Sequence, residues 1–362
     1  MTIIEALDFA EPGSLPNFGA PFMAHAPASA ASALSHVTRD NCVGAVITTR
    51  DRGAARRAAH TIFANNSRAA VLVDADQYSG KGRKHGSDPM STLWVNWQLK
   101  IGLPWALTDS GYIAQGNRSE LRDVLTWRGD APQVITALPL AKSWLTHDSD
   151  ILIEEVNAAG GPVALMLEDV SDPLASTSAV TGLIAVLRAE VPVLVTRSDS
   201  SALGALAYGA AAVSVGVKSS LRHIFPVIDD GGGRTPPTSA FVPGLLAYKY
   251  LTAIDDAITR SPDLSVWVCT CSVCCGRRLD WIIDAVDPHT AAFEHSLAAQ
   301  AELAQSILAT ASHTRPSMWR DMCARAQLRY DDITTKNNKI WKAPPALKAW
   351  VSSTPVPHSS IH

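Results

Sequence analysis

This 362-residue sequence has little that points to a membrane, to secretion or to an excess of one charge. No window has the roughly 18 uninterrupted apolar residues that a membrane-spanning helix needs. The first twenty positions carry Glu5, Asp8 and Glu11 but no basic residue, so the basic region of a signal peptide is missing. The net charge of -3 says little about partners, because a nucleic-acid enzyme needs only a local basic face. We therefore expect a cytoplasmic protein with no membrane partner.

Cysteine is also scarce, with six residues in the whole chain, yet four of them fall within the segment 269–275. Cys42 and Cys323 stand alone. Disulfide frameworks spread their cysteines along a chain, whereas metal sites cluster them. A hydrophobic content of 47% is that of an ordinary globular protein and excludes wholesale disorder. The length suits one large domain or two ordinary ones.

Short apolar runs alternate with amphipathic stretches along the first two thirds of the chain. Runs without polar alternation are typical of strands buried on both faces, and hence of a parallel sheet with helices outside it. The eight runs are 20–26, 43–49, 70–73, 105–108, 133–138, 163–167, 191–196 and 211–217.

Helices are predicted between these runs, for example over 53–65, 119–127, 176–190 and 201–208, the last ended by Gly209. Eight strand–helix alternations predict an α/β fold, the (β/α)8 TIM barrel. An open doubly wound sheet is the alternative, but no G-x-G-x-x-G follows the first strand.

The predicted strands nearly all end in polar residues. Catalytic groups of such barrels sit at the carboxyl ends of strands, so this recurrence favours an active site there. The residues are His25, Arg50, Asp51, Asp74, Asp76, Asp109, Glu168, Asp169, Arg197, Asp199 and Lys218.

The character of the sequence changes after the eighth run. We expect residues 1–235 to form the barrel, 236–335 a zinc-binding helical segment packed on it, and 336–362 a basic tail rich in Pro and Ser that frays at its end. Within the middle segment, helices are predicted over 242–259 and 288–310.

The cysteine cluster has the spacing of a metal site. Cys269, Cys271 and Cys274 put three thiolates in one turn, where they can converge on a tetrahedral ion if a fourth ligand arrives. His295 is the expected fourth ligand, and His289 and Cys275 are weaker candidates. Three cysteines and one histidine close the coordination sphere, so we expect a structural Zn2+.

A C-x-C-x-x-C turn followed some twenty residues later by a helical histidine, after the last strand of a barrel, resembles the tRNA-guanine transglycosylase superfamily. This superfamily includes the DNA-acting enzymes that install 7-deazaguanines. The segment 107–112, Leu-Thr-Asp-Ser-Gly-Tyr, is similar to the family's Thr-Asp-Ser-Gly-Gly-aromatic motif. The resemblance covers about residues 18–307.

The resemblance implies catalytic aspartates at strand ends. Asp109 lies in the matching motif and would be the acid/base or base-recognising group. Asp74 competes for this role, because it ends the third predicted strand, where the family keeps its motif, whereas Asp109 follows the fourth. Ser110 and Gly111 would then contact the substrate, and both aspartates are expected to face the site.

The resemblance also implies a nucleophilic aspartate in the eighth strand, but that run reads Ala-Val-Ser-Val-Gly over 212–216. The nearest downstream pair is Asp229–Asp230. Asp229 lies 40 residues before Cys269 (269 minus 229), close to the family's separation of nucleophile and zinc turn. Asp229 is therefore the predicted nucleophile, with Asp169 in reserve.

Other residues are candidates for substrate contact. Gln77 could pair with a purine and Tyr78 could stack on it. Three basic segments could form a nucleic-acid rim, namely 81–85, 277–278 and 336–348, the last with Trp341 interleaved.

Together these features predict an Asp-dependent transglycosylase that exchanges guanine for a free 7-deazaguanine base in nucleic acid. DNA is slightly favoured over tRNA, because little sequence follows the predicted zinc helices. A homodimer or partner proteins of a modification system would suit this role. One alternative is a nucleic-acid-binding accessory protein that keeps the barrel and zinc site without the nucleophile. Another alternative is a barrel hydrolase of small metabolites, which would bind neither DNA nor tRNA. A gel shift that shows binding at modest salt would refute it.

Overall fold

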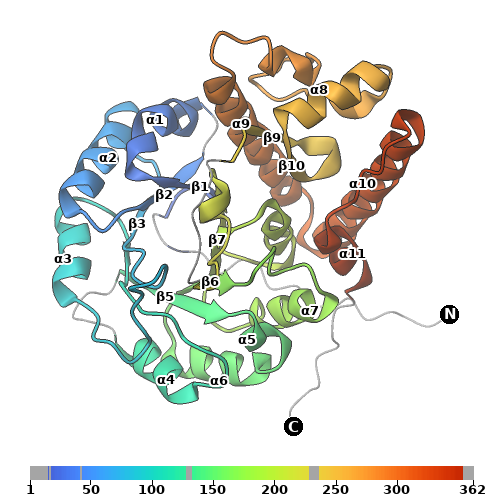
Figure 1. Ribbon diagram of the computed structural model, residues 1–362. Helices are drawn as coiled ribbons and strands as arrows, with labels where there is room; N and C mark the ends of the chain where they lie inside the picture. The colour runs from blue at the N-terminus through green and yellow to red at the C-terminus, as the bar shows by residue number, and fades with distance from the viewer. Residues whose placement is uncertain (1–14, 16–17, 41–42, 128–132, 228–235, 354–362) are drawn as a thin grey trace.

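A computed structural model describes residues 15, 18–40, 43–127, 133–227 and 236–353 (Figure 1). Eight parallel strands form a nearly closed barrel, as the sequence predicts. In sheet order they run β3-β2-β1-β8-β7-β6-β5-β4, and β3 contacts β4 across the remaining gap. The strands are β1 (Phe22–Pro27), β2 (Gly44–Thr48), β3 (Val71–Asp74), β4 (Ala106–Leu107), β5 (Val134–Ala141), β6 (Val163–Glu168), β7 (Val193–Ser198) and β8 (Ala212–Gly216).

Helices follow the strands and cover the outside of the barrel (Figure 1). Side-chain caps fix several starts, as where Asp51 accepts from the Gly53 amide and Ser176 from the Ala179 amide. The elements are η1 (Ala28–Ala30), α1 (Ala31–Asp40), α2 (Arg52–Asn65), α3 (Thr92–Lys100), α4 (Arg118–Thr126), α5 (Ser143–Thr146), α6 (Ser149–Ala159), α7 (Thr177–Val186) and the 3-10 helix η2 (Ser200–Tyr208). Within the described residues, no helix is long and apolar enough to span a membrane.

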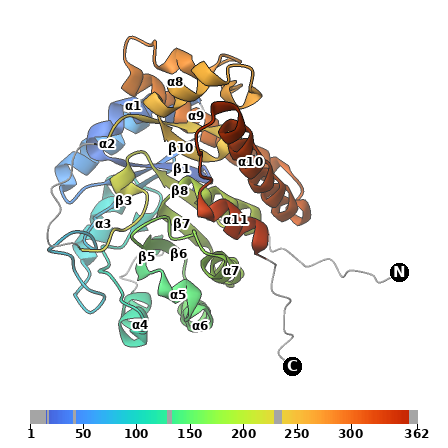
Figure 2. The same ribbon diagram turned by 45° about the vertical axis from the view of Figure 1, so that its right-hand side comes forward.

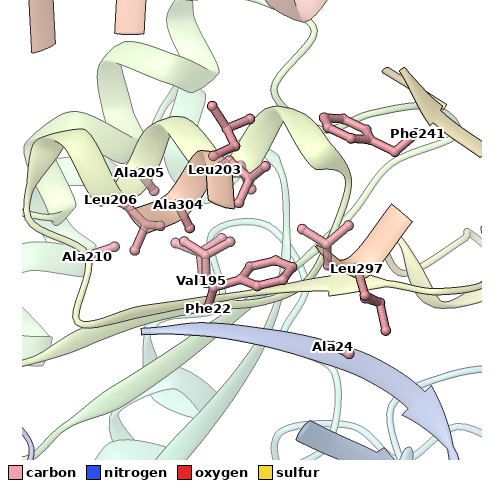
Figure 3. Packing of buried hydrophobic residues seen from close by; sticks show 14 of the residues in the cluster. Phe22, Ala24, Val195, Leu203, Ala205, Leu206, Ala210, Phe241, Leu297 and Ala304 are labelled. Carbon is pink, nitrogen blue, oxygen red and sulfur yellow. The ribbon is translucent and has the colours of Figure 1, made fainter. Parts of the chain in front are cut away.

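The eighth helix of the barrel is α9 (Pro288–Ala309), far from β8 in the sequence. It contacts β1, α1 and η2, the position that the helix after the eighth strand takes in a (β/α)8 barrel. Figure 3 shows Leu297 and Ala304 of α9 meeting side chains of β1, β7 and η2. Helix α9 lies within the segment 236–335 that was predicted to bind zinc and to pack on the barrel, and it packs against β1 and η2 as the eighth barrel helix. The cysteine-bearing segment is an insertion within the last βα unit.

The insertion begins with a β-hairpin where the sequence analysis predicted a helix over 242–259. Strands β9 (Ser239–Val242) and β10 (Ala247–Tyr250) pair antiparallel around η4 (Pro243–Leu245). The prediction failed because Pro243 and the left-handed Leu246, at φ 51°, break the apparent helical period. Helix α8 starts only at Leu251 and runs to Arg260, and η3 (Ser219–Leu221), η5 (Ser265–Trp267) and η6 (Leu279–Ile282) complete this part.

Residues 336–353, predicted to belong to a basic tail rich in Pro and Ser, include the end of one helix and the whole of another. After η7 (Ser312–Thr314), helix α10 (Arg315–Asn337) and helix α11 (Pro345–Ser352) pack on α7, η2 and α9 along one side of the barrel (Figure 2). Trp350 is fully buried and donates from its indole to the Ser201 carbonyl at 3.0 Å. Helix α11 is short, and its buried residues are Ala346, Leu347, Ala349 and Trp350. The predicted fraying concerned the end of the chain, and residues 354–362 lie outside the described part.

Candidate active site and metal centre

The inside of the barrel is layered, apolar below and polar above. Inward positions of a strand recur every second residue, so each strand can contribute one residue to each layer. Met23, Val46, Leu72 and Ala212 belong to a buried apolar cluster. Two residues further along the same strands stand His25, Thr48, Asp74 and Ser214. The alternation of β1, β2, β3 and β8 thus builds a polar layer at the carboxyl end of the barrel.

Asp74 is the centre of this polar layer. Its Oδ2 atom accepts a hydrogen bond from the Tyr78 hydroxyl at 2.6 Å and lies 3.2 Å from Nε2 of His25. Its Oδ1 atom accepts from the backbone amide of Asp76 at 2.8 Å. The side chain is only 2% exposed. Asp74 is thus held rigidly and is already supplied with hydrogen-bond donors.

Arg197 supplies the positive charge of the layer. A β-bulge separates Val195 from Ser198, and Arg197 has a φ of 49°, a left-handed conformation that is uncommon for a side-chain-bearing residue. Its Nη1 donates to Oδ1 of Asp76 at 2.7 Å and lies 3.7 Å from Oδ2 of Asp74. The guanidinium also donates to the Ser220 carbonyl at 3.3 Å. Strained backbone of this kind occurs preferentially at functional sites.

The protonation states of His25 and Asp74 follow from their surroundings. Burial lowers the pKa of His25 more than the hydrogen bond to Asp74 raises it. Burial by itself raises the pKa of Asp74, but the hydrogen bonds from His25 and Tyr78 and the charge of Arg197 together lower it. The Arg197 amide donates to Nδ1 of His25 at 3.1 Å, so the neutral ring carries its proton on Nε2 and donates from there. The pair is a neutral imidazole beside a carboxylate.

Ser214 is the residue of the eighth strand, where the resemblance implies an aspartate, that takes part in the polar layer. Its hydroxyl lies 3.1 Å from Nδ1 of His25 and accepts from the Arg197 amide at 3.0 Å. It is fully buried. The eighth strand therefore contributes a neutral hydroxyl to the polar layer, as the sequence indicates.

Asp109 lies just beyond β4 and is also buried, at 6% exposure. Its Oδ1 atom accepts from the backbone amide of Ser91 at 2.8 Å. Ser110 is enclosed and shares a 2.7 Å hydrogen bond with Thr108. Gly111 packs so closely on His85 that a Cβ atom would stand 2.0 Å from the His85 carbonyl oxygen. These contacts tie the Asp-Ser-Gly segment to the loop after β3.

That loop also crosses the mouth of the barrel. Arg83 forms an ion pair with Glu168 at the end of β6, and its guanidinium lies 3.7 Å from the ring centroid of Tyr112. Tyr112 donates to the other oxygen of Glu168. Gln77 is partly buried, and its carbonyl accepts from the Lys84 amide at 2.7 Å. Tyr78, proposed for stacking, has its ring buried in the barrel and its hydroxyl on Asp74.

Further carboxylates at the strand ends are paired. Asp169, the reserve nucleophile, forms an ion pair with Lys142. Asp199 bonds Nδ1 of His223 at 2.7 Å. Desolvation and the nearby Asp199 charge raise the pKa of Asp172 to about 7, a range that suits proton transfer. Asp229, the predicted nucleophile, lies outside the described residues.

The four predicted metal ligands come together. The ligand atoms of Cys269, Cys271, Cys274 and His295 all lie within 4.8 Å of one another, and all four residues are buried. Nδ1 of His295 lies 3.1 Å from the Cys274 sulfur. This donor set could hold a metal ion and is compatible with zinc.

The surroundings of the cluster are those of a ligand shell. Nε2 of His295 donates to the Phe241 carbonyl at 2.7 Å, which fixes the ring so that Nδ1 faces the sulfurs. The Trp281 indole donates to the Cys274 sulfur at 3.2 Å. Cys275 is exposed and points to the Ser272 carbonyl, while His289 contacts Thr238, so neither competes with His295.

Several cations of the basic segments proposed as a nucleic-acid rim are paired with acids. Arg83 pairs with Glu168, Arg278 with Asp280, and Lys336 with Asp263. Lys339 lies 3.1 Å from Asp256. Pairing reduces the charge that these segments can offer to a phosphate backbone.

Sequence reasoning identified Asp74 and the metal ligands, but it gave no role to Ser214, Asp172 or His223. A usable signal was the two-residue spacing of Met23–His25, Leu72–Asp74 and Ala212–Ser214. Each pair puts a polar residue one layer above an apolar one.

No family model matches the chain, and no curated protein is significantly similar to it. The barrel, its polar layer and the Cys3His cluster are therefore the observations on which a functional proposal must stand.

Proposed function

We propose that this protein is a zinc-containing barrel enzyme that exchanges guanine for a 7-deazaguanine base in DNA or tRNA. The observation that carries the proposal is the Cys3His cluster, which joins an insertion after β8 to α9, the eighth helix of the barrel. This is the arrangement that the resemblance to the tRNA-guanine transglycosylases leads us to expect. The buried aspartates at the ends of β3 and β4 supply carboxylates where barrel enzymes keep their catalytic groups.

Base exchange needs two kinds of group. A carboxylate attacks C1′ of the nucleotide as the glycosidic bond to guanine breaks, and an acid/base group protonates the leaving guanine. The incoming base then attacks C1′, gives its proton to the acid/base group and releases the carboxylate. Asp229 is the proposed nucleophile.

The two buried aspartates divide the remaining work. The hydrogen bond from His25 and the charge of Arg197 lower the pKa of Asp74, so Asp74 stays ionised, and because both of its oxygens already accept hydrogen bonds from the chain we assign it the role of holding the polar layer in place. Among the described residues, the hydrogen bond from Ser91 engages only Oδ1 of Asp109. Its other oxygen can therefore exchange a proton, and we assign Asp109 the acid/base role.

Zinc, when bound by Cys269, Cys271, Cys274 and His295, would have a structural role, because four protein ligands leave no open position. It would fix the inserted hairpin against α9. Reduced thiolates persist in the cytoplasm, and a cytoplasmic location is part of the proposal.

The test is to replace Asp109 and Asp229 separately by Asn and to follow exchange of labelled guanine in DNA and in tRNA. Each change should lower the exchange rate by about 100-fold or more. Asp123→Asn, on the exposed face of α4, is the matched control and should leave the rate unchanged. Activity that survives both substitutions would overturn the mechanism.

One observation favours a second function. The eighth strand has no carboxylate over 212–216, and its Ser214 is buried in hydrogen bonds with His25 and Arg197. A protein of this kind could bind nucleic acid as an accessory subunit without catalysing exchange. Wild-type protein that binds DNA or tRNA but incorporates no labelled guanine would establish this second function.

A further inference from the structure

A cleft opens at the carboxyl end of the barrel between the end of β8 and the inserted hairpin. Its volume is about 860 Å3. The walls come from residues 217–222, from β10 and from the start of α1, and the first turns of α9 form its floor. In Figure 1, β9 and β10 lie beside α9 near β1. The volume is at the upper end of the roughly 300–1,000 Å3 of sites that enclose one small ligand, so the cleft has room for a nucleotide.

The charge of the cleft has one sign. Lys218 and Arg222 line it, and no Asp or Glu is found among the described lining residues. Lys218 is exposed, and within the described part of the chain no carboxylate pairs with it. This distinguishes the cleft from the basic segments around Arg83, Arg278 and Lys336, whose charges are matched by acids. An anionic ligand is therefore expected here.

Aromatic faces stand beside these cations. The Arg222 guanidinium lies 3.8 Å from the ring centroid of Tyr248 and covers it. Tyr250, at the end of β10, is 50% exposed, and Phe293 of α9 is partly buried in the floor. Stacked bases and guanidinium planes next to positive charge are the usual means of binding single-stranded nucleic acid. Hydroxyl groups of Ser219, Ser220 and Thr238 add donors for phosphate or sugar oxygens.

The cleft shares a chain segment with the polar layer of the barrel. The Ser220 carbonyl accepts from Arg197, whose guanidinium lies beside Asp74 and Asp76, while the same residue lines the cleft. Gly216 lets this segment fold back over β8, because a Cβ atom there would stand 2.3 Å from the Leu221 carbonyl carbon. A nucleic-acid strand bound in the cleft would therefore be separated from Asp74 by a single layer of polypeptide.

We propose that this cleft, with Lys218, Arg222 and Tyr250 as its principal contacts, binds a single-stranded stretch of nucleic acid next to the barrel mouth. The choice of nucleic acid as the ligand rests on the proposed function. The new part of the inference is the surface that binds the nucleic-acid strand. DNA and RNA share the phosphate and base chemistry involved.

The test measures the fluorescence anisotropy of a labelled oligothymidylate and a labelled oligouridylate of equal length, titrated with the full chain. Lys218→Glu should weaken binding of both oligonucleotides about tenfold at low salt. It should also reduce the slope of the logarithm of the binding constant against the logarithm of salt concentration by the contribution of roughly one phosphate contact. Lys100→Glu, an exposed residue at the end of α3, makes the same charge change and should leave affinity within about twofold of wild type.

The aromatic contact is tested independently. Tyr250→Ala should weaken binding about five- to tenfold, whereas Tyr250→Phe should keep wild-type affinity, because only the ring face is needed. An unchanged midpoint of thermal unfolding shows that the variants are folded. Wild-type affinity in both Lys218→Glu and Tyr250→Ala, or equal weakening in Lys100→Glu, would overturn the inference. Thymidine monophosphate that competes as well as the oligonucleotide would also overturn it, since the occupant would then be a free nucleotide.

The outcomes separate this inference from the proposed function. If oligonucleotide binding depends on Lys218 and Tyr250 but the protein exchanges no guanine, binding in the cleft is supported and the proposed enzyme activity is refuted. If the protein exchanges guanine but its oligonucleotide binding is unaffected by both substitutions, the proposed enzyme activity is supported and binding in the cleft is refuted.

Discussion

The two buried polar clusters of this protein are built on opposite principles. In the barrel, Asp74, His25 and Arg197 satisfy one another within the chain. In the insertion, the sulfurs of Cys269, Cys271 and Cys274 converge with His295, and such a group is fully satisfied only by a cation that the chain does not supply. The barrel layer is therefore preorganised before any ligand arrives, whereas the cluster in the insertion could be completed by a metal ion.

The largest effect should come from removing one metal ligand. Cys274→Ser is expected to abolish stoichiometric zinc binding and to lower the free energy of unfolding by more than about 4 kcal/mol, because structural metal sites contribute directly to folding. Metal analysis and denaturant unfolding measure the two effects. Cys275→Ser is the matched control, since its exposed sulfur lies outside the cluster, and it should change neither. Equal effects of both substitutions would show that the cluster does not depend on a metal.

A smaller but substantial effect is expected in the barrel. Asp74→Asn removes one of the two carboxylates near Arg197, whose side chain is only 5% exposed. Because breaking a buried ion pair costs about 3–5 kcal/mol, we expect a decrease of that size in the free energy of unfolding. Asp76 is more exposed, at 24%, so Asp76→Asn should cost clearly less. Denaturant unfolding compares the two. A result in which Asp76→Asn is the more damaging change would mean that Asp74 is not the centre of the layer.

The smallest effect concerns pH. The folded-state pKa values of His25 and Asp74 both lie below their unfolded values of 6.5 and 3.8. The unfolded chain therefore binds more protons, and the His25 contribution is complete above pH 6.5 and is lost as the pH falls below it. The Asp74 contribution is lost only below about pH 3.8.

Replacing His25 by Gln should reduce the slope of the free energy of unfolding against pH between about pH 6.5 and 5, by up to about 1.4 kcal/mol per pH unit. Urea unfolding of the wild type and the variant over this range gives the comparison. Parallel curves for the two proteins would contradict a neutral, buried His25.

Much of the fold could be predicted because its signals are local. Eight apolar runs identified the strands, and Gly209, at φ 98°, ended η2 as expected. The cluster that could hold a metal ion could be predicted because three of its residues lie within six positions, which keeps them close together. The hairpin of β9 and β10 escaped prediction because Pro243 and the left-handed Leu246 interrupt an apparent helical period, and helix α11 escaped it because Trp350 is buried against a distant partner, the Ser201 carbonyl.

The sequence by itself determined the barrel, the layered strands and the donor set of the metal cluster, since each depends on the spacing of neighbouring residues. The tertiary structure decided which groups meet across the chain. It placed Ser214 and Asp74 on opposite sides of one imidazole, 189 and 49 residues from His25. It made α9 the eighth barrel helix, and it left Lys218 in a cleft without carboxylates among its described residues while Arg83 and Lys336 found acids. Long-range pairing is set by barrel closure, which local sequence does not encode.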